Sequence, residues 1–322
     1  MQILARWTLP IILALAAPAQ AAAPPQADCP GGQALAPFKS RPITAAQDVL
    51  FFRTDRIKLD IDGSPKAYGV KDQGTENICN GLGPLRPPIC KGKVSAANGC
   101  YAACQAAFRA WDGNPATLGQ YMCSIGLGGG SCGTPKVKLQ STPREAWFVS
   151  ETSVHPAKPA DVAMTTGAWL QSQGGQLDSE QIPYFVIPGG FRAMAYDATP
   201  GDLGVVVRED GSAVPFIVGD TGGNLDEGSA RLIARLKGLE ALPTQKKTNA
   251  FGQQVDRLSG EGAGAFRIAI FRHTAPLPVG HRSSDPSLLT VTAADLPEWI
   301  RAKAQAKLDA IGGTATVIAC AK

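Results

Sequence analysis

The sequence predicts a β-rich α+β fold in which an antiparallel or barrel-like sheet has a few flanking helices and is stabilised by disulfides. The 322 residues include 36 glycines and 25 prolines, a composition that favours turns and argues against a bundle of long helices. Strand patterns are frequent and do not alternate regularly with helical ones, so a parallel Rossmann-like sheet is not expected. With 44% hydrophobic and 18% charged residues, the chain can bury a core of ordinary size.

Six segments are predicted as strands, because apolar residues alternate with polar ones or form short runs bounded by turn residues. Two of them flank the sequence Glu209-Asp210-Gly211, whose Asp-Gly pair predicts a β-hairpin. The predicted strands are Ile57–Asp62, Ala146–Ser150, Ile182–Pro188, Leu203–Val207, Ala213–Val218 and Phe266–Phe271.

Two amphipathic helices are predicted near the C-terminal end of the chain. Ser229 is expected to begin the first, which extends to about Leu239 and buries a stripe made of Ala230, Ile233, Leu236 and Leu239. The second spans Thr292–Ile311, with Thr292 as its N-cap and Gly312-Gly313 as its end.

The N-terminal residues have the pattern of a secretory signal peptide. Arg6 supplies a positive charge, Trp7–Ala17 is a short apolar run, and Ala19-Gln20-Ala21 fits the small-x-small cleavage rule. The apolar run is too short for a membrane anchor. We therefore expect removal of residues 1–21 and secretion of the mature chain to the periplasm or outside the cell, with no membrane contact afterwards. Residues 22–46 are expected to be a flexible leader, and residues 47–322 a single domain.

Eight cysteines, an even number in a predicted oxidising compartment, indicate disulfides. They are Cys29, Cys79, Cys90, Cys100, Cys104, Cys123, Cys132 and Cys320. A bridge between Cys29 and Cys320 could tie the two ends of the chain together, but the sequence leaves the pairing of all eight cysteines open. The region 76–136, with helix-compatible sequence in Val94–Trp111, is expected to be a disulfide-pinned excursion from the core.

A zinc site is the competing explanation for the cysteines. Against it, the chain has no Cys-x-x-Cys pair, and its three histidines, His155, His273 and His281, are scattered. We therefore expect no metal and no other cofactor. The formal net charge of +4 is dispersed, so nucleic acid is not an expected partner.

Carboxylates are the remaining candidates for chemistry, because no nucleophile elbow or phosphate-binding loop follows a predicted strand, and paired cysteines do not provide a thiol nucleophile. Asp220 lies where a buried strand ends, Glu227 lies just before a helix, and glycines between them allow the chain to fold back. Such a pair suits glycoside hydrolysis, which in an inverting enzyme separates two carboxyls by roughly 6.5–9.5 Å. By spacing alone, a turn-forming Asp and a helix-dipole Glu are the more common explanation.

Four stretches of the chain occur in the order seen in glycoside hydrolase family 75, the fungal-type chitosanases and their bacterial relatives. They are Ile57–Gly69 (IKLDIDGSPKAYG), Trp147–Val154 (WFVSETSV), Leu177–Gly190 (LDSEQIPYFVIPGG) and Phe216–Leu232 (FIVGDTGGNLDEGSARL). Because the chain resembles a bacterial-type member of this family, the resemblance implies a secreted, endo-acting, inverting glycosidase that cleaves β-1,4 linkages in chitosan without a cofactor. It implies Glu227 as the general acid and Asp220 as the general base.

The chain departs from the family in two places. The spacing between Asp220 and Glu227 is shorter, and Asp226 stands before Glu227 where the family has glycine. A neighbouring carboxyl group would tend to raise the pKa of the acid. The cysteine-rich region 76–136 does not match the family.

A cleft for polycationic chitosan is expected to carry further carboxylates and aromatic rings. The candidates for substrate binding are Asp60, Asp62, Tyr68, Asp202 and Asp226, with Asp178 and Glu180 as further acidic residues. Ordinary surface solvation is the more common fate of such residues. Tyr68, Trp147, Tyr184 and Phe191 are candidates for stacking on sugar rings, although core packing is favoured for Tyr184 and Trp147.

Two other functions remain open at this point. One is a catalytically inactive glycan-binding or cell-envelope protein on the same scaffold, which the short Asp220–Glu227 loop motivates. The other is a thiol- or zinc-dependent hydrolase, which would require free thiols. For the chitosan-cleaving enzyme we expect a monomer whose partner is an amino-sugar polysaccharide.

Overall fold

The computed structural model describes residues 29–65, 128–129, 134–135, 139–141, 146–248, 254–280 and 286–322. Several sequence predictions lie outside these residues. They concern the signal peptide, Tyr68, the excursion 76–136 except for residues 128–129 and 134–135, and the six cysteines from Cys79 to Cys132.

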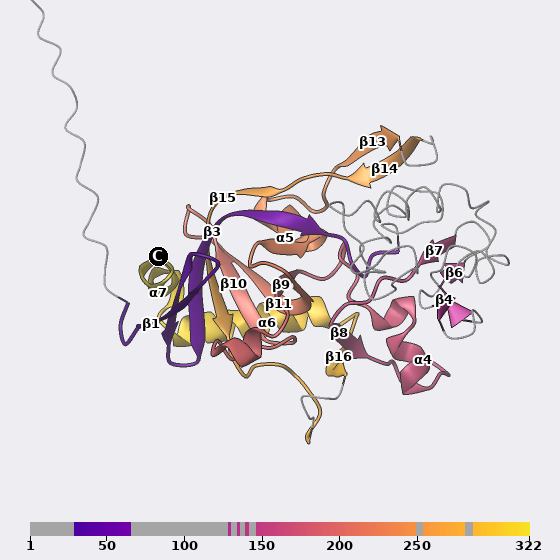
Figure 1. The fold of residues 1–322 in the computed structure, drawn as a ribbon, viewed down its shortest axis with the longest axis horizontal. Coiled ribbons are helices and arrows are strands. Elements are labelled where there is room, and N and C mark those ends of the chain that lie inside the picture. Colours follow the sequence, from indigo (N-terminus) through magenta and orange to yellow (C-terminus); the bar gives the residue numbers. More distant parts are fainter. Residues whose placement is uncertain are drawn as a thin grey trace, which may run out of the picture.

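Six strands close into a barrel, because the first and last of the series also pair with each other (Figure 1). Neighbouring pairs are antiparallel except for β12 with β3 and β9 with β11, which are parallel. This architecture confirms the predicted β-rich α+β class with a barrel-like sheet. In barrel order the strands are β3 (Val49–Asp60), β12 (Glu227–Ser229), β9 (Tyr184–Pro188), β11 (Ala213–Gly222), β10 (Leu203–Val207) and β15 (Gly262–Phe271).

An N-terminal hairpin extends the sheet beyond β3. Its strands are β1 (Gln33–Phe38) and β2 (Arg41–Ala46), and β2 pairs with β3. The prediction of a flexible leader is therefore wrong for residues 33–46. Lys39 and Ser40 form the two-residue turn with φ of 46° and 66°, the left-handed values that such hairpins require. Neither residue is the Gly or Asn that usually marks this turn, which explains why the hairpin escaped prediction.

Alternate residues along the barrel strands enter two hydrophobic clusters, as the two-residue period of a strand requires. One cluster contains Phe185 and Phe216 and packs against α5 (Ala230–Leu236). The other contains Val186 and packs against α6 (Leu296–Ala310) and α7 (Gly313–Cys320). Five of the six barrel strands thus contribute apolar side chains to both clusters, and the exception is the short β12, Glu227-Gly228-Ser229.

The two predicted helices form with shifted ends. Ser229 caps α5, because its Oγ accepts a hydrogen bond from the Leu232 amide, but the helix ends before Leu239, which is exposed. The predicted N-cap Thr292 ends strand β16 (Ser287–Thr292), so α6 begins after Asp295. At its other end α6 stops at Ala310, within one residue of the predicted Ile311, and Gly312 separates it from α7, which begins at Gly313.

The termini of the described chain meet at the Cys29–Cys320 disulfide, which confirms the prediction of disulfide bonding and is one of the pairings that the sequence left open. Figure 1 shows α7, which carries Cys320, beside β1. Among the described residues, none of the helices is sufficiently long and apolar to cross a membrane.

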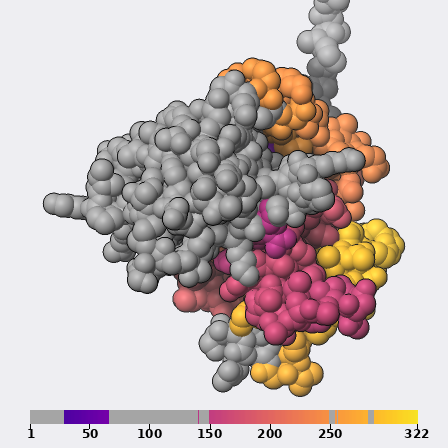
Figure 2. Space-filling view, turned by 90° about the vertical axis from the view of Figure 1, so that its right-hand side faces the viewer, coloured from indigo at the N-terminus to yellow at the C-terminus, as the bar shows by residue number. Residues whose placement is uncertain are grey.

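Shorter elements complete the described part of the chain. The predicted hairpin of β10 and β11 is present, and β11 continues to Gly222. On the face shown in Figure 2, the rose segment around α4 lies next to the gold segment that leads into β16. The shorter elements are β4 (Gly128–Gly129), β5 (Thr134–Pro135), β6 (Leu139–Ser141), β7 (Ala146–Phe148), β8 (Val154–Ala157), α4 (Thr166–Leu170), β13 (Thr244–Thr248) and β14 (Gln254–Leu258), with 3-10 turns at Gln173–Gly175 and Phe191–Met194.

Candidate active site

Asp220 and Glu227 flank the same residue of the barrel. Strand β9 lies between β11 and β12, and its Val186 pairs with Asp220 on one side and with Glu227 on the other. Since neighbouring strands lie about 4.8 Å apart, the two Cα atoms are separated by roughly 10 Å. Paired residues direct their side chains to the same face of a sheet, so both carboxylates lie on the face that carries the Val186 side chain.

A β-bulge sets the direction of Asp220. The pairing of β11 with β9 shifts between Val218 and Asp220, so Gly219 is an extra residue at this point. A Cβ atom on Gly219 would lie 2.5 Å from the Tyr184 Cβ, a distance that only glycine avoids. In this Gly-Asp sequence, Gly219 lets the backbone of β11 pass close to Tyr184, and the bulge changes the direction of the Asp220 side chain.

Asp60 and Asp62 converge on Asp220 from the end of β3. One carboxylate oxygen of each residue lies within 4.8 Å of the others, and we call these three residues the aspartate cluster. Hydrogen bonds from neighbouring side chains fix the backbone of Asp60 and Asp62. Ser179 Oγ donates to the Asp60 carbonyl at 2.6 Å. The buried Tyr184 hydroxyl donates to the Asp62 carbonyl at 2.9 Å.

Gly63 makes the turn that brings Asp62 back toward Asp60. Its φ is +76°, and a Cβ at this position would lie 2.0 Å from the Leu177 carbonyl oxygen. The Asp62 amide donates to Asp60 Oδ1 at 2.9 Å. The sequence Asp-Ile-Asp-Gly therefore folds both aspartates toward the same point.

Two serines of the segment before β8 bind the aspartate cluster. Ser153 donates to Asp220 Oδ1 from its amide at 3.0 Å and from its Oγ at 2.6 Å. The Thr221 amide donates to the same oxygen at 2.7 Å. Ser150 Oγ donates to Asp62 Oδ1 at 2.8 Å. Neither serine was predicted as a site residue, although both lie in Trp147–Val154, one of the four stretches on which the resemblance rests.

The environment of the cluster raises the pKa values of Asp60 and Asp220 and so favours their protonated forms. Burial, followed by the charge of Asp62, raises the pKa of Asp220 to about 7, against the opposing effect of the Ser153 and Thr221 hydrogen bonds. Burial, followed by the charges of Asp62 and Asp220, raises the pKa of Asp60 well above its usual value. Carboxylates this close repel one another unless they share a proton or a cation. These aspartates are also the described residues that could ligate a metal ion.

Glu227 is half-buried and lies close to the cluster, since its charge contributes to the raised pKa of Asp60. Its Oε2 lies 2.9 Å from the position that a Cβ on Gly222 would take. Gly222 therefore leaves room for the Glu227 carboxylate above Val186. Together, Asp60, Asp62, Asp220 and Glu227 form a four-carboxylate site at one end of the barrel strands.

The other predicted site residues lie elsewhere. Asp226 does not join the cluster but forms ion pairs with Lys58 at 3.2 Å and Arg56 at 3.8 Å. Asp178 binds its own turn, accepting from the Glu180 amide at 2.9 Å and the Gln181 side chain at 2.9 Å.

The structure contradicts two substrate-binding predictions. Asp202 is fully buried and accepts hydrogen bonds from the Thr274 and Thr199 amides, so it holds two loops together and cannot contact a substrate. Phe191 is buried and stacks on Tyr196, which leaves no face for a sugar ring. Core packing is confirmed for Tyr184, whereas the Trp147 side chain lies outside the described part.

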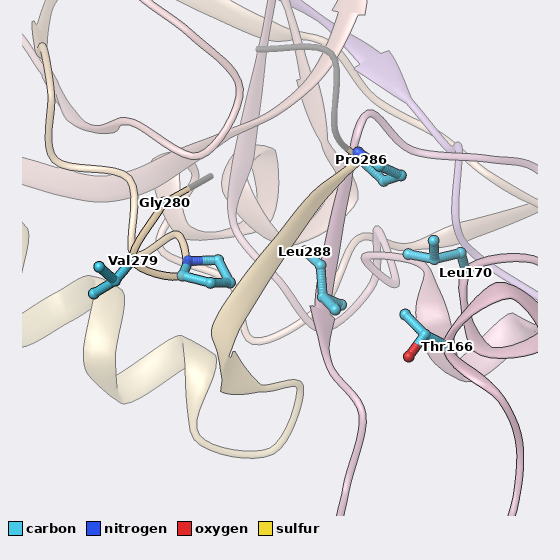
Figure 3. Close-up of a pocket in the computed structure, with 7 residues that line it drawn as sticks. Thr166, Leu170, Val279, Gly280, Pro286 and Leu288 are labelled. Atoms are coloured by element: carbon cyan, nitrogen blue, oxygen red, sulfur yellow. The ribbon is translucent and has the colours of Figure 1, made fainter. Parts of the chain in front are cut away.

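A separate cavity of about 270 Å³ opens between α4 and the loop that precedes β16. Figure 3 shows Leu288 between Val279 on one side and Leu170 and Thr166 on the other. Its lining is mostly apolar and includes none of the four carboxylates. This cavity therefore does not belong to the carboxylate site.

Comparisons with known proteins add no assignment. A scan against protein-family models and a search of curated proteins return no match to the chain.

Proposed function

We propose that the protein is a secreted endo-glycosidase that cleaves β-1,4 linkages in chitosan or a related amino-sugar polymer with inversion. The observation that carries this proposal is the placement of Asp220 and Glu227 on either side of Val186 and on one face of the sheet. A separation of roughly 10 Å between their Cα atoms, by strand spacing, is compatible with the range of carboxyl separations in inverting enzymes.

In this mechanism, one carboxylic acid protonates the glycosidic oxygen while the opposite carboxylate removes a proton from water. The water oxygen bonds to C1 as the bond from C1 to the leaving oxygen breaks. The products are a new reducing end with inverted configuration and a free hydroxyl on the other fragment. The donated and abstracted protons balance, and solvent then restores both carboxyl groups.

The raised pKa of Asp220 supports its role as the proton donor. A carboxyl group that keeps its proton up to about pH 7 is suited to protonate a leaving oxygen. Glu227, which is half-buried, would then activate the water. This assignment reverses the roles that the resemblance to glycoside hydrolase family 75 implies. With Asp220 as the acid, kcat/KM falls as the pH rises through about 7; with Asp220 as the base, kcat/KM falls as the pH drops through that value.

The preference for a cationic polymer rests on the charge of the site. The cluster places Asp60 and Asp62 beside Asp220, and a protonated amino sugar would offset their mutual repulsion. A neutral polymer such as cellulose offers no such compensation. The disulfide between Cys29 and Cys320 is consistent with secretion into an oxidising compartment.

The test is the release of reducing ends from chitosan, chitin and soluble cellulose by the wild-type protein and by Asp220→Asn and Glu227→Gln. We expect activity on chitosan, and a loss of at least about 10³-fold in each variant, because each removes one proton-transfer group. Asp55→Asn is the matched control, since Asp55 is an exposed carboxylate on the same strand as Asp60. A folded wild-type protein without activity would favour the glycan-binding alternative, and active variants would exclude the catalytic pair.

A further inference from the structure

The loop that joins the two proposed catalytic carboxylates is held by cationic side chains from a distant part of the chain. Lys39 Nζ donates to the Gly223 carbonyl at 2.7 Å and to Asn224 Oδ1 at 2.9 Å. Arg41 Nη1 donates to the Leu225 carbonyl at 2.6 Å. These contacts join the tip of the β1–β2 hairpin to residues more than 180 positions later in the chain.

The same loop is held from β3 at its other end. The Lys58 amide donates to the Asp226 carbonyl at 2.7 Å, and the Lys58 ammonium pairs with Asp226 Oδ2 at 3.2 Å. Every residue from Gly223 to Asp226 thus has a main-chain or side-chain oxygen bound to a cationic residue. Since Glu227 follows directly and pairs with Val186, the path of this loop determines where its carboxylate lies.

The hairpin tip is itself constrained in a way that favours a dedicated role. Lys39 and Ser40 both have left-handed φ values, which cost energy for residues other than glycine. Phe38 fixes the tip by packing edge-on against Phe191, with ring centroids 6.1 Å apart. Arg41 Nη2 also reaches Thr54 Oγ1 at 3.3 Å, which aligns its guanidinium with the Leu225 carbonyl.

We propose that Lys39 and Arg41 are positioning residues of the glycosidase: the hairpin tip clamps residues 223–225 and thereby holds the Glu227 carboxylate in its position opposite Asp220. This inference rests on the proposed function for its catalytic consequence, but the clamp itself is independent of any substrate. Neither cation touches the reacting atoms, and both act through the loop.

The substrate-independent test is hydrogen exchange, followed by mass spectrometry, of the peptides that cover residues 219–228. We expect Arg41→Gln to speed exchange in this segment by about tenfold or more, because the loop then opens without breaking a charge-assisted bond. Lys39→Met should have a smaller effect in the same direction. Arg53→Gln, which removes an exposed arginine from β3 that pairs with Asp55, should leave these peptides unchanged.

The catalytic test is a comparison of kcat and KM on chitosan. We expect Arg41→Gln to lower kcat about tenfold with KM changed less than twofold, and Arg41→Lys to recover part of the loss because it restores one donor. If Arg41 is needed for folding, a lower melting temperature will show it, and the exposed Lys39 then carries the test. Wild-type exchange in 219–228, or faster exchange with wild-type kcat, would overturn the proposal. Active Asp220→Asn and Glu227→Gln variants would instead overturn the proposed function and leave the exchange result standing.

Discussion

Two buried aspartates, one just before β10 and one on the neighbouring β11, illustrate how neighbours decide the role of a carboxylate. Asp202 precedes β10, and its two oxygens accept from different donors, the Thr274 amide and the Thr199 amide. Asp220 lies on β11, and its three donors all bind Oδ1. Burial raises the pKa of both, but only Asp220 has carboxylates beside it. The first arrangement suits a structural anchor, and the second suits a group that exchanges protons.

The largest change in stability is expected when the disulfide is removed. Replacing both Cys29 and Cys320 with alanine should lower the free energy of unfolding by about 3–5 kcal/mol, because the bridge closes a loop across 291 positions. Urea unfolding measures this effect. Since the bridge lies far from both aspartates in the chain, the pH dependence of stability should keep its shape; a changed shape would mean that the aspartate cluster depends on the tied termini.

Asparagine substitutions should have opposite effects at the two aspartates. Asp202→Asn should destabilise the protein by about 2 kcal/mol, since its NH₂ group would face a backbone donor. Asp220→Asn should stabilise it by about 1–3 kcal/mol at pH 7, because Oδ1 still accepts its three bonds while a charge beside Asp62 is removed. Thermal and urea unfolding of both variants checks this prediction. Changes of the same sign in the two variants would show that Asp202 and Asp220 do not differ in role.

The stability of the protein should fall as the pH rises from about 4 to 7. The folded protein holds the Asp220 proton up to about pH 7, whereas the unfolded chain loses it near 3.8, so the folded state binds more protons in this window. One such group contributes a slope of about −1.4 kcal/mol per pH unit. Asp220→Asn should make the slope shallower, and an unchanged slope across the window would show that Asp220 titrates normally.

The smallest effect on stability is expected at Gly222. Gly222→Ala would place a methyl group 2.9 Å from Glu227 Oε2, the far end of a flexible side chain that can move aside, and 2.9 Å from Cγ1 of the buried Val186. We expect a loss of about 1 kcal/mol in stability, because the methyl group presses on Val186. We also expect a loss of about tenfold in kcat, because a displaced carboxylate no longer faces Asp220. Equal kcat values for this variant and the wild type would show that the position of Glu227 over Val186 is not critical.

Local patterns sufficed to predict several elements of the fold. The Asp-Gly turn predicts the β10–β11 hairpin, and Ser229 predicts the start of α5. The cysteines predict disulfide bonding but not its pairing, so Cys29–Cys320 is one of several bridges that the sequence allows. The β1–β2 hairpin lacked such a signal, because its turn places Lys39 and Ser40 at positions where glycine or asparagine is usual.

The candidate site was only partly predictable. Glycine-rich stretches and the resemblance identified the four carboxylates Asp220, Glu227, Asp60 and Asp62. The placement of Asp220 and Glu227 on either side of Val186, however, depends on the pairing register of β9 with β11 and β12 and on the bulge at Gly219. No local pattern encodes that register. Asp202 was misjudged for the same reason, since the donors that bury it come from Thr199 and from Thr274, which is 72 residues away.

The most direct measurement is the anomeric configuration of the reducing ends that form first during chitosan hydrolysis, followed by proton NMR on the wild-type protein. In the proposed inverting mechanism, a water attacks from the side of the sugar opposite the acid, so a β-1,4 linkage gives the α-anomer first. This anomer then mutarotates to the equilibrium mixture. Initial formation of the β-anomer, or no hydrolysis by the folded protein, would contradict the account.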